Sequence, residues 1–177
     1  MTEKIIIAGA GGQGIMLLGK VLAEAAMRED KFVTWFPSYG AEVRGGAAYC
    51  MVVISDKEIG SPYIDKADTL IVMSAPALEK FKARLKNKGL LIINTSLVPE
   101  GAGYKNSAAV KHPFTDIAFD LGNIRVANMV ALGCYLAARK IVKGKNIFQA
   151  IEEIAPANKK GLIEINKQAL AKGVKLR

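Results

Sequence analysis

The sequence predicts an α/β fold, a doubly wound and mostly parallel sheet with helices on both faces. Two observations lead to this fold class: short apolar runs alternate with helical patterns, and a glycine-rich turn joins the first run to the first helical pattern. Such alternation is typical of parallel sheets whose crossover helices cover both faces. The length of 177 residues suits one domain, which we place over residues 1–177.

The first part of the chain reads as strand, glycine turn, helix and strand. Residues Ile5–Ala8 are continuously apolar, which favours a central strand covered on both faces. Residues Gly14–Arg28 carry apolar side chains at helical spacing, and Lys31–Phe36 forms a second short strand that Pro37 stops. Together these segments predict one βαβ unit with a right-handed crossover, the opening unit of a Rossmann-like fold.

The rest of the chain continues this alternation and then becomes mainly helical. Apolar, β-branched runs are predicted strands, and stretches with helical spacing are predicted helices. The strands are Ala47–Ser55, Thr69–Met73 and Leu90–Ile93, and the helices are Ala77–Lys86, Val126–Arg139, Ile147–Ile154 and Ala157–Lys172.

Proline, glycine and asparagine residues set the predicted helix boundaries. Pro76 suits the start of the first of these four helices, and Gly89 suits its end. Asn146 is a predicted cap for the third, and Pro156 is predicted to end it. Gly161 is a weak point in the last helix.

Charge is distributed unevenly along the chain. The formal net charge is +9; residues 1–138 carry 15 basic and 13 acidic side chains, and residues 139–177 carry 10 and 3. This basic part is either a solvated lysine-rich face or a contact for an acidic partner, an anionic ligand or nucleic acid. Phe148 is its single aromatic residue, so base stacking is weakly supported and a nucleic-acid role is disfavoured.

Cysteine, histidine and hydropathy patterns exclude several classes. Cys50 and Cys134 are isolated in apolar runs, so we expect buried thiols and no cluster or disulfide framework. His112 stands beside Pro113 in a predicted loop and is interpreted as a surface or structural residue rather than a catalytic base. Pro99–Asn106 contains proline and glycine and is a further predicted loop. No apolar stretch is long enough to span a bilayer and the amino terminus lacks a secretory signal, so a cytoplasmic location without membrane contact is expected.

The first candidate site is the GxGxxG turn after the first strand. It consists of Gly9, Gly11, Gly12, Gln13 and Gly14, with Ala10 between the first two glycines. Such turns bring backbone N–H groups close to a phosphate or carboxylate at a helix start. The alternative is that the glycines only permit tight packing of strand and helix. No acidic residue ends the second strand to hold a ribose, so a classical NAD dehydrogenase is poorly supported.

The second candidate site is the loop Pro37–Gly46, between the second and third strands. Hydroxyl, charged and glycine residues are concentrated in it, namely Ser38, Tyr39, Gly40, Glu42, Arg44, Gly45 and Gly46. Arg44 suits a bidentate contact with carboxylate or phosphate, although Glu42 and Arg44 equally suit each other. If the first two strands are adjacent and parallel, both loops share one edge of the sheet and form one polar surface.

Two motifs together resemble the gamma subunit, or gamma domain, of 2-oxoacid:ferredoxin oxidoreductases. These are the GxGGQG turn and PSYGAEVRGG, residues 37–46. Two later segments fit the same resemblance, Phe114–Ala118 and the NMxxLG pattern of Asn128–Gly133. The similarity covers nearly the whole chain, and the SYGAEVRGG form is closest to subunits of the 2-oxoglutarate and branched-chain types.

This resemblance implies a role in the oxidative decarboxylation of a 2-oxoacid, 2-oxoglutarate first, with coenzyme A to acyl-CoA, CO2 and reduced ferredoxin. Thiamine diphosphate, Mg and iron–sulfur clusters would be held by alpha, beta and ferredoxin-like delta partners, with ferredoxin as acceptor. The chain alone would bind no cofactor, hold no catalytic residue and be inactive. Whether it also forms a dimer with itself stays open. Two other classes stay open: a stand-alone nucleotide-binding oxidoreductase, and a non-catalytic binding or regulatory module.

Overall fold

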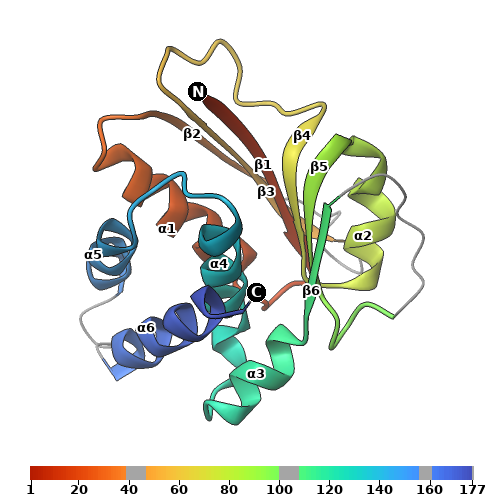
Figure 1. Cartoon of the computed structure of the whole chain (residues 1–177), viewed down its shortest axis with the longest axis vertical. Coiled ribbons are helices and arrows are strands. Elements are labelled where there is room, and N and C mark those ends of the chain that lie inside the picture. The colour runs from red at the N-terminus through yellow and green to blue at the C-terminus, as the bar shows by residue number, and fades with distance from the viewer. Residues whose placement is uncertain (39–46, 100–107, 156–160, 177) are drawn as a thin grey trace.

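The computed structural model describes residues 1–38, 47–99, 108–155 and 161–176 (Figure 1). Its centre is a six-stranded sheet in the order β2-β3-β1-β4-β5-β6. The strands are β1 (Thr2–Gly9), β2 (Phe32–Pro37), β3 (Ala48–Ser55), β4 (Ala67–Val72), β5 (Leu85–Asn94) and β6 (Ala108–His112). The predicted α/β class is confirmed, and Ile5, Ile6 and Ile7 are fully buried in the middle of the sheet as expected.

Strand β3 lies between β1 and β2, which were predicted to be adjacent. β4, β5 and β6 continue the sheet from β1 in parallel, whereas β3 pairs antiparallel with both β1 and β2. β1 and β2 therefore run in the same direction but are not adjacent, so that part of the prediction was wrong. An apolar run reads the same in either direction, which is why hydropathy did not reveal the reversal.

The helices cover both faces of the sheet unequally. They are α1 (Ile15–Met27), α2 (Ala75–Phe81), α3 (Phe114–Asp120), α4 (Ala127–Ala138), α5 (Gly144–Ile154) and α6 (Gly161–Val174), with short 3-10 turns η2 (Lys82–Arg84) and η3 (Ile124–Val126). α2 lies on one face, and the other five helices lie on the opposite face (Figure 1). No helix within the described residues is both long enough and apolar enough to cross a membrane.

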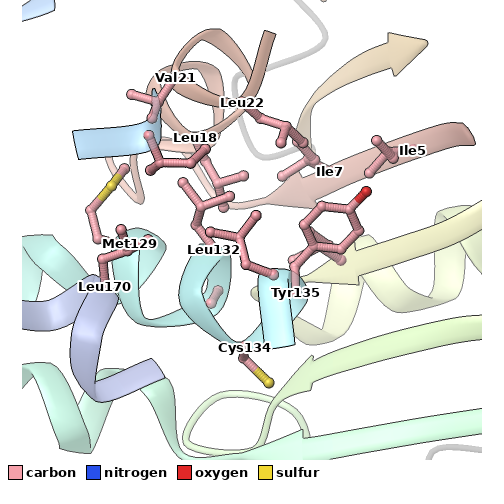
Figure 2. Close-up of a cluster of buried hydrophobic side chains, with 14 of the residues drawn as sticks. Ile5, Ile7, Leu18, Val21, Leu22, Met129, Leu132, Cys134, Tyr135 and Leu170 are labelled. Atoms are coloured by element: carbon pink, nitrogen blue, oxygen red, sulfur yellow. The ribbon is translucent and has the colours of Figure 1, made fainter. Parts of the chain in front are cut away.

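Alternate residues of the central strands enter two separate cores. Ile5 and Ile7 face the larger helical layer, whereas Ile6 faces α2. Figure 2 shows Leu18 of α1 and Leu132 of α4 meeting over these strand residues. Burial of β1 on both faces explains its unbroken apolar run.

Several predicted boundaries differ from the structure. The helix predicted to reach Lys86 ends at Phe81, and Gly89 lies inside β5 rather than at a helix end. Asn146 lies inside α5, where its side chain donates to Glu29 Oε1 at 2.7 Å instead of capping the helix. His112 ends an unpredicted edge strand, β6, rather than lying in a loop.

Other predicted boundaries fall partly beyond the described residues. α6 begins at Gly161, whereas Pro156 and the start of the predicted last helix at Ala157 lie outside the described residues. The predicted loop Pro99–Asn106 is described only at Pro99.

Helices α4 and α6 cross at backbone distance. A Cβ atom added to Gly173 would lie 2.0 Å from the carbonyl oxygen of Val130, and one added to Gly133 would lie 2.1 Å from that of Leu170. Only glycine permits this approach, which gives a physical reason for the final glycine of the NMxxLG pattern.

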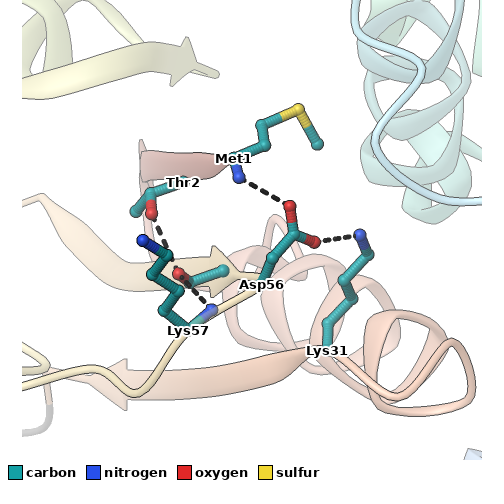
Figure 3. A network of polar contacts seen from close by, with 6 residues as sticks. Met1, Thr2, Lys31, Asp56 and Lys57 are labelled. Carbon is teal, nitrogen blue, oxygen red and sulfur yellow. Dashed lines mark hydrogen bonds and ion pairs between the residues drawn. The ribbon is translucent and has the colours of Figure 1, made fainter.

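A polar cluster lies where β1 and β2 begin and β3 ends (Figure 3). Asp56 contacts both the amino group of Met1 and the ammonium of Lys31, and these hydrogen bonds lower the pKa of its carboxyl to about 2. The hydroxyls of Thr2 and Ser55 lie 2.9 Å apart beside it. The glycine loop follows β1 at the opposite end of the strands, where β2 also ends at Pro37.

Candidate functional site

The carboxyl ends of β1, β4 and β5 meet around one backbone carbonyl. Met73, directly after β4, accepts hydrogen bonds from the side chains of Gln13 at 3.1 Å and Asn94 at 3.4 Å. Its own N–H donates to the carbonyl of Ala8 at 2.8 Å, which extends the pairing of β1 and β4. We call the Gly9–Gly14 loop together with Met73, Asn94 and Asn128 the strand-end surface.

The side chain of Gln13 connects the glycine loop to the residue that follows β4. Its Oε1 accepts a hydrogen bond from the N–H of Ala10 at 2.6 Å, while its Nε2 donates to Met73. A Cβ atom on Gly9 would lie 2.5 Å from that Oε1 and 2.9 Å from Cβ of Met73. Gln13 therefore fixes the loop to β4, and Gly9 is a packing glycine.

Asn128 fixes the other end of the loop. Its Nδ2 donates to the carbonyl oxygen of Gly14 at 3.1 Å, and a Cβ atom on Gly14 would lie 2.3 Å from the same nitrogen. Gly14 also has a φ of 70°, a left-handed conformation that favours glycine, and it precedes the first turn of α1. The NMxxLG segment thus holds the GxGGQG loop in place.

Asn94 connects β5 to helix α3. It is fully buried and donates to the hydroxyl of Thr115 at 2.8 Å, while the Thr115 N–H donates back to its Oδ1 at 3.3 Å. Thr115 belongs to the Phe114–Ala118 segment of the resemblance. Asn94 and Asn128 were not among the site residues predicted from the sequence. For Asn94 the available signal was a polar residue directly after a predicted apolar strand.

The two inner glycines differ from the outer pair in the space around them. A Cβ atom added to Gly11 or Gly12 would meet no atom of the described part of the chain within 4 Å, and both residues are exposed. Among the described residues, neither glycine N–H has a hydrogen-bond partner. The packing interpretation therefore applies to Gly9 and Gly14. Gly11 and Gly12 present amides without a described partner beside a helix start, and anion binding by them stays a prediction.

The second loop begins at the same edge of the sheet. β2 ends at Pro37 beside Cys50 of β3, and the N–H of Ser38 donates to the carbonyl of Tyr49 at 3.0 Å. The remaining predicted site residues lie outside the described residues, namely Tyr39, Gly40, Glu42, Arg44, Gly45 and Gly46. Their contacts with the glycine loop stay a prediction, with β3 lying between the two parent strands.

The described residues do not fit an iron–sulfur cluster or a metal site. They contain no group of three or more His, Cys, Asp or Glu side chains suited to a metal ion. The two thiols are buried, and desolvation raises the pKa of Cys50 to about 12 and that of Cys134 to about 11. Partial burial lowers the pKa of His112, so its imidazole is neutral at neutral pH.

The chain matches one family model over residues 4–176, that of pyruvate ferredoxin/flavodoxin oxidoreductase. It is 36% identical to 2-oxoglutarate synthase subunit KorC of Methanocaldococcus jannaschii, a match covering 98% of this chain and 92% of the relative. It is 33% identical to ketoisovalerate oxidoreductase subunit VorA of Methanothermobacter thermautotrophicus over 96% of this chain. The chain spans about a third of that relative, 35% of its length.

A solved structure has the same architecture. It is the keto/oxoacid ferredoxin oxidoreductase gamma subunit from Geobacter sulfurreducens, 32% identical, with a TM-score of 0.84. The similarity covers 97% of this chain and 95% of that subunit.

Proposed function

Because the chain belongs to the pyruvate ferredoxin/flavodoxin oxidoreductase family, we propose that it is the gamma subunit of a 2-oxoacid:ferredoxin oxidoreductase complex. The similarity to a gamma subunit and to KorC extends over nearly the whole of each chain, which supports a separate subunit of this kind. Alpha, beta and ferredoxin-like delta chains are the proposed partners.

The proposed reaction joins a 2-oxoacid to coenzyme A. The bond between the carboxylate and the keto carbon breaks to release CO2, and the acyl group forms a thioester with the sulfur of coenzyme A. The thiol proton is released, and two electrons pass to oxidised ferredoxin. Thiamine diphosphate supplies the electron sink for this decarboxylation when bound. We propose that thiamine diphosphate, Mg and the clusters are held by the partner chains, as the resemblance to the family implies.

The observation that best supports a role for this chain is the pair of exposed backbone N–H groups of Gly11 and Gly12, which have no hydrogen-bond partner among the described residues. They precede the 13-residue helix α1, whose amino end attracts anions. We propose that they bind a phosphate group of coenzyme A at the strand-end surface. Gln13 and Asn128 position the loop for this contact without touching the ligand.

The substitution Gly11→Ala tests this assignment in the reconstituted complex. The new methyl group meets no atom of the described residues within 4 Å, so the fold should persist, but the group would stand where the phosphate approaches. We expect the KM for coenzyme A to rise roughly tenfold, about the effect of losing one hydrogen bond to a charged group. The KM for the 2-oxoacid should stay unchanged.

Gly60→Ala is the matched control, because a Cβ atom there also meets nothing within 4 Å and the residue follows β3 at the opposite edge. Equal kinetic constants for both variants would overturn the coenzyme A contact. Gly14→Ala should instead prevent folding or assembly, since its methyl group would collide with Asn128.

Arg44 gives a second test on the other loop. If its guanidinium binds a carboxylate or phosphate, Arg44→Ala should weaken coenzyme A affinity or assembly of the complex. Normal assembly, coenzyme A affinity and turnover would exclude this role.

We propose 2-oxoglutarate as the 2-oxoacid, supported by the near full-length match to KorC. The similarity to VorA makes 2-ketoisovalerate the second candidate. The ratio of kcat/KM values for 2-oxoglutarate, 2-ketoisovalerate and pyruvate, measured on complex isolated through this chain, decides between them. A higher kcat/KM for either competitor would refute the first choice.

A further inference from the structure

A groove runs between helices α5 and α6 on the outer side of the larger helical layer. α6 is held at backbone distance from α4 by Gly133 and Gly173. α5 instead packs on α1, with Asn146 hydrogen-bonded to Glu29. Because the two helices are held by different neighbours, the space between them is only partly filled.

The groove consists of two hollows that share Phe148 and Ala171. One is about 410 Å³ and lies between the end of α4, the start of α5 and the end of α6. The second, about 420 Å³, continues along α6 past Lys167 to Glu164. Together they follow α6 over its last three turns.

Apolar side chains line the floor of the first hollow, and lysines stand at its edge. The floor contains Leu136, Val142 and Leu170, which are nearly buried, and Val174, which is 45% exposed. Lys140 and Lys175 line the same hollow. A hollow with an apolar floor and lysines in its lining is complementary to a segment that carries apolar and acidic side chains together.

The lysines of this region are not neutralised by the chain itself. Within the described residues, no acidic side chain forms an ion pair with Lys140, Lys143, Lys145, Lys172 or Lys175. Two of the three nearby acids are already paired, Glu152 with Lys167 and Glu153 with Arg28. A positive field therefore surrounds the apolar floor.

We propose that this α5–α6 groove binds an amphipathic helical segment of a partner subunit, with an apolar face and acidic flanks. The inference rests on the proposed function, because it takes the partner from the oxidoreductase complex. The stretch from Glu164 to Lys175 covers about 16 Å of helix axis, which matches roughly three turns of a docked helix. A second copy is a poorer occupant, because the same lysines on both surfaces would face each other.

The charge-reversal pair Lys140→Glu with Lys175→Glu tests the groove in the assembled complex. Both residues are exposed, so the fold and its Tm should not change. The affinity of this chain for the remaining subunits should fall roughly tenfold at low salt, with a smaller loss at high salt. The control pair Lys57→Glu with Lys88→Glu makes the same change of net charge away from the groove. Lys57 lies just after β3, Lys88 lies in β5, and both are exposed.

A photo-crosslinking side chain at Val174 identifies the occupant. Val174→p-benzoylphenylalanine in the reconstituted complex should crosslink to an acidic, amphipathic helical segment of a partner subunit. Crosslinking to a second copy, no crosslinking, or equal losses of affinity for both lysine pairs would each overturn the proposal. Failure of the wild-type chain to assemble at all would refute the proposed function instead, so the two failures are distinguishable.

Discussion

At the scale of single residues, the core contains polar groups whose burial has measurable costs. Tyr135 of α4 is fully buried with its hydroxyl directed toward Ile5 (Figure 2), and that oxygen has no partner among the described residues. Burial raises the pKa of Tyr135 well above its ordinary value. The two thiols are equally enclosed, at 0% and 1% exposure for Cys50 and Cys134. These groups belong to packing rather than to the strand-end surface.

Removing the unpartnered hydroxyl should not destabilise the protein. Tyr135→Phe keeps the ring and deletes a buried oxygen that has lost its water without gaining a partner. We expect the free energy of unfolding in urea to stay equal or rise by about 1 kcal/mol. The exposed Tyr63→Phe should leave it unchanged. A loss larger than about 1 kcal/mol would reveal a hydrogen bond to Tyr135.

The thiols should be unreactive in the folded protein. Cys50 also donates to the carbonyl oxygen of Ile15 at 3.5 Å, and the raised pKa values disfavour the nucleophilic thiolate of both residues. A chromogenic disulfide reagent at pH 8 should label neither cysteine in the native chain and both after unfolding in urea. Rapid labelling of the native chain would show that this part of the core opens.

At the scale of elements, hydropathy predicted the buried strands and helices well, but edges and boundaries less well. The Ile5–Ala8 part of β1 is apolar on both faces and α4 is buried around most of its circumference, so both apolar patterns are unambiguous. Edge strand β6 is short and largely exposed, and no clear period marks it. Gly89 and Asn146 have propensities suited to helix ends, yet pairing with β4 and the bond to Glu29 determine their actual places.

The crossing of α4 and α6 yields a sharp prediction. Gly173→Ala places a methyl group on the carbonyl of Val130, so the helices must separate and lose packing on both sides. We expect the free energy of unfolding to fall by about 3 kcal/mol, measured by urea denaturation. Gly144→Ala, where the added atom meets nothing, is the control. Equal stability of the two variants would mean that the helices are farther apart than described.

At the scale of the whole molecule, long-range polar contacts determine how the parts are joined. The sequence predicted that β1 and β2 end at the same side of the sheet, where the glycine loop and Ser38 lie, because both strands run in the same direction. The residues that hold the glycine loop could not be predicted from the sequence. Asn128 lies 114 residues from Gly14 along the chain, and local patterns do not reveal such pairings. The antiparallel β3 was missed for the same reason.

One such long-range cluster should make stability depend on pH. Glu3 of β1 accepts a hydrogen bond from Thr69 of β4 at 2.6 Å and lies 3.6 Å from Nε of Arg139, beyond α4. Desolvation nevertheless raises the pKa of Glu3 above its ordinary value of 4.5. The folded state therefore favours the neutral carboxyl, and its contribution to stability is present at low pH and lost as pH rises through the folded pKa.

Glu3→Gln keeps an acceptor for Thr69 and removes the titration. The difference in free energy of unfolding between this variant and the wild type should grow in favour of the variant as pH rises above 4.5, then level off. Urea denaturation between pH 4 and pH 8 measures it, with the exposed Glu58→Gln as control. A variant that loses stability at neutral pH would show that the ion pair with Arg139 outweighs desolvation.

The reversed strand β3 also affects the order in which a growing chain can fold. The central strand β1 is synthesised first, but its neighbours are residues 48–55 and 69–72. It therefore leaves the ribosome long before either neighbour does. β2 and β3 are close together in the chain and antiparallel, so they can pair locally while β1 waits. We therefore expect nascent sheet formation to start at an edge, and the apolar β1 segment to lack both neighbouring strands until residues 48–72 have emerged.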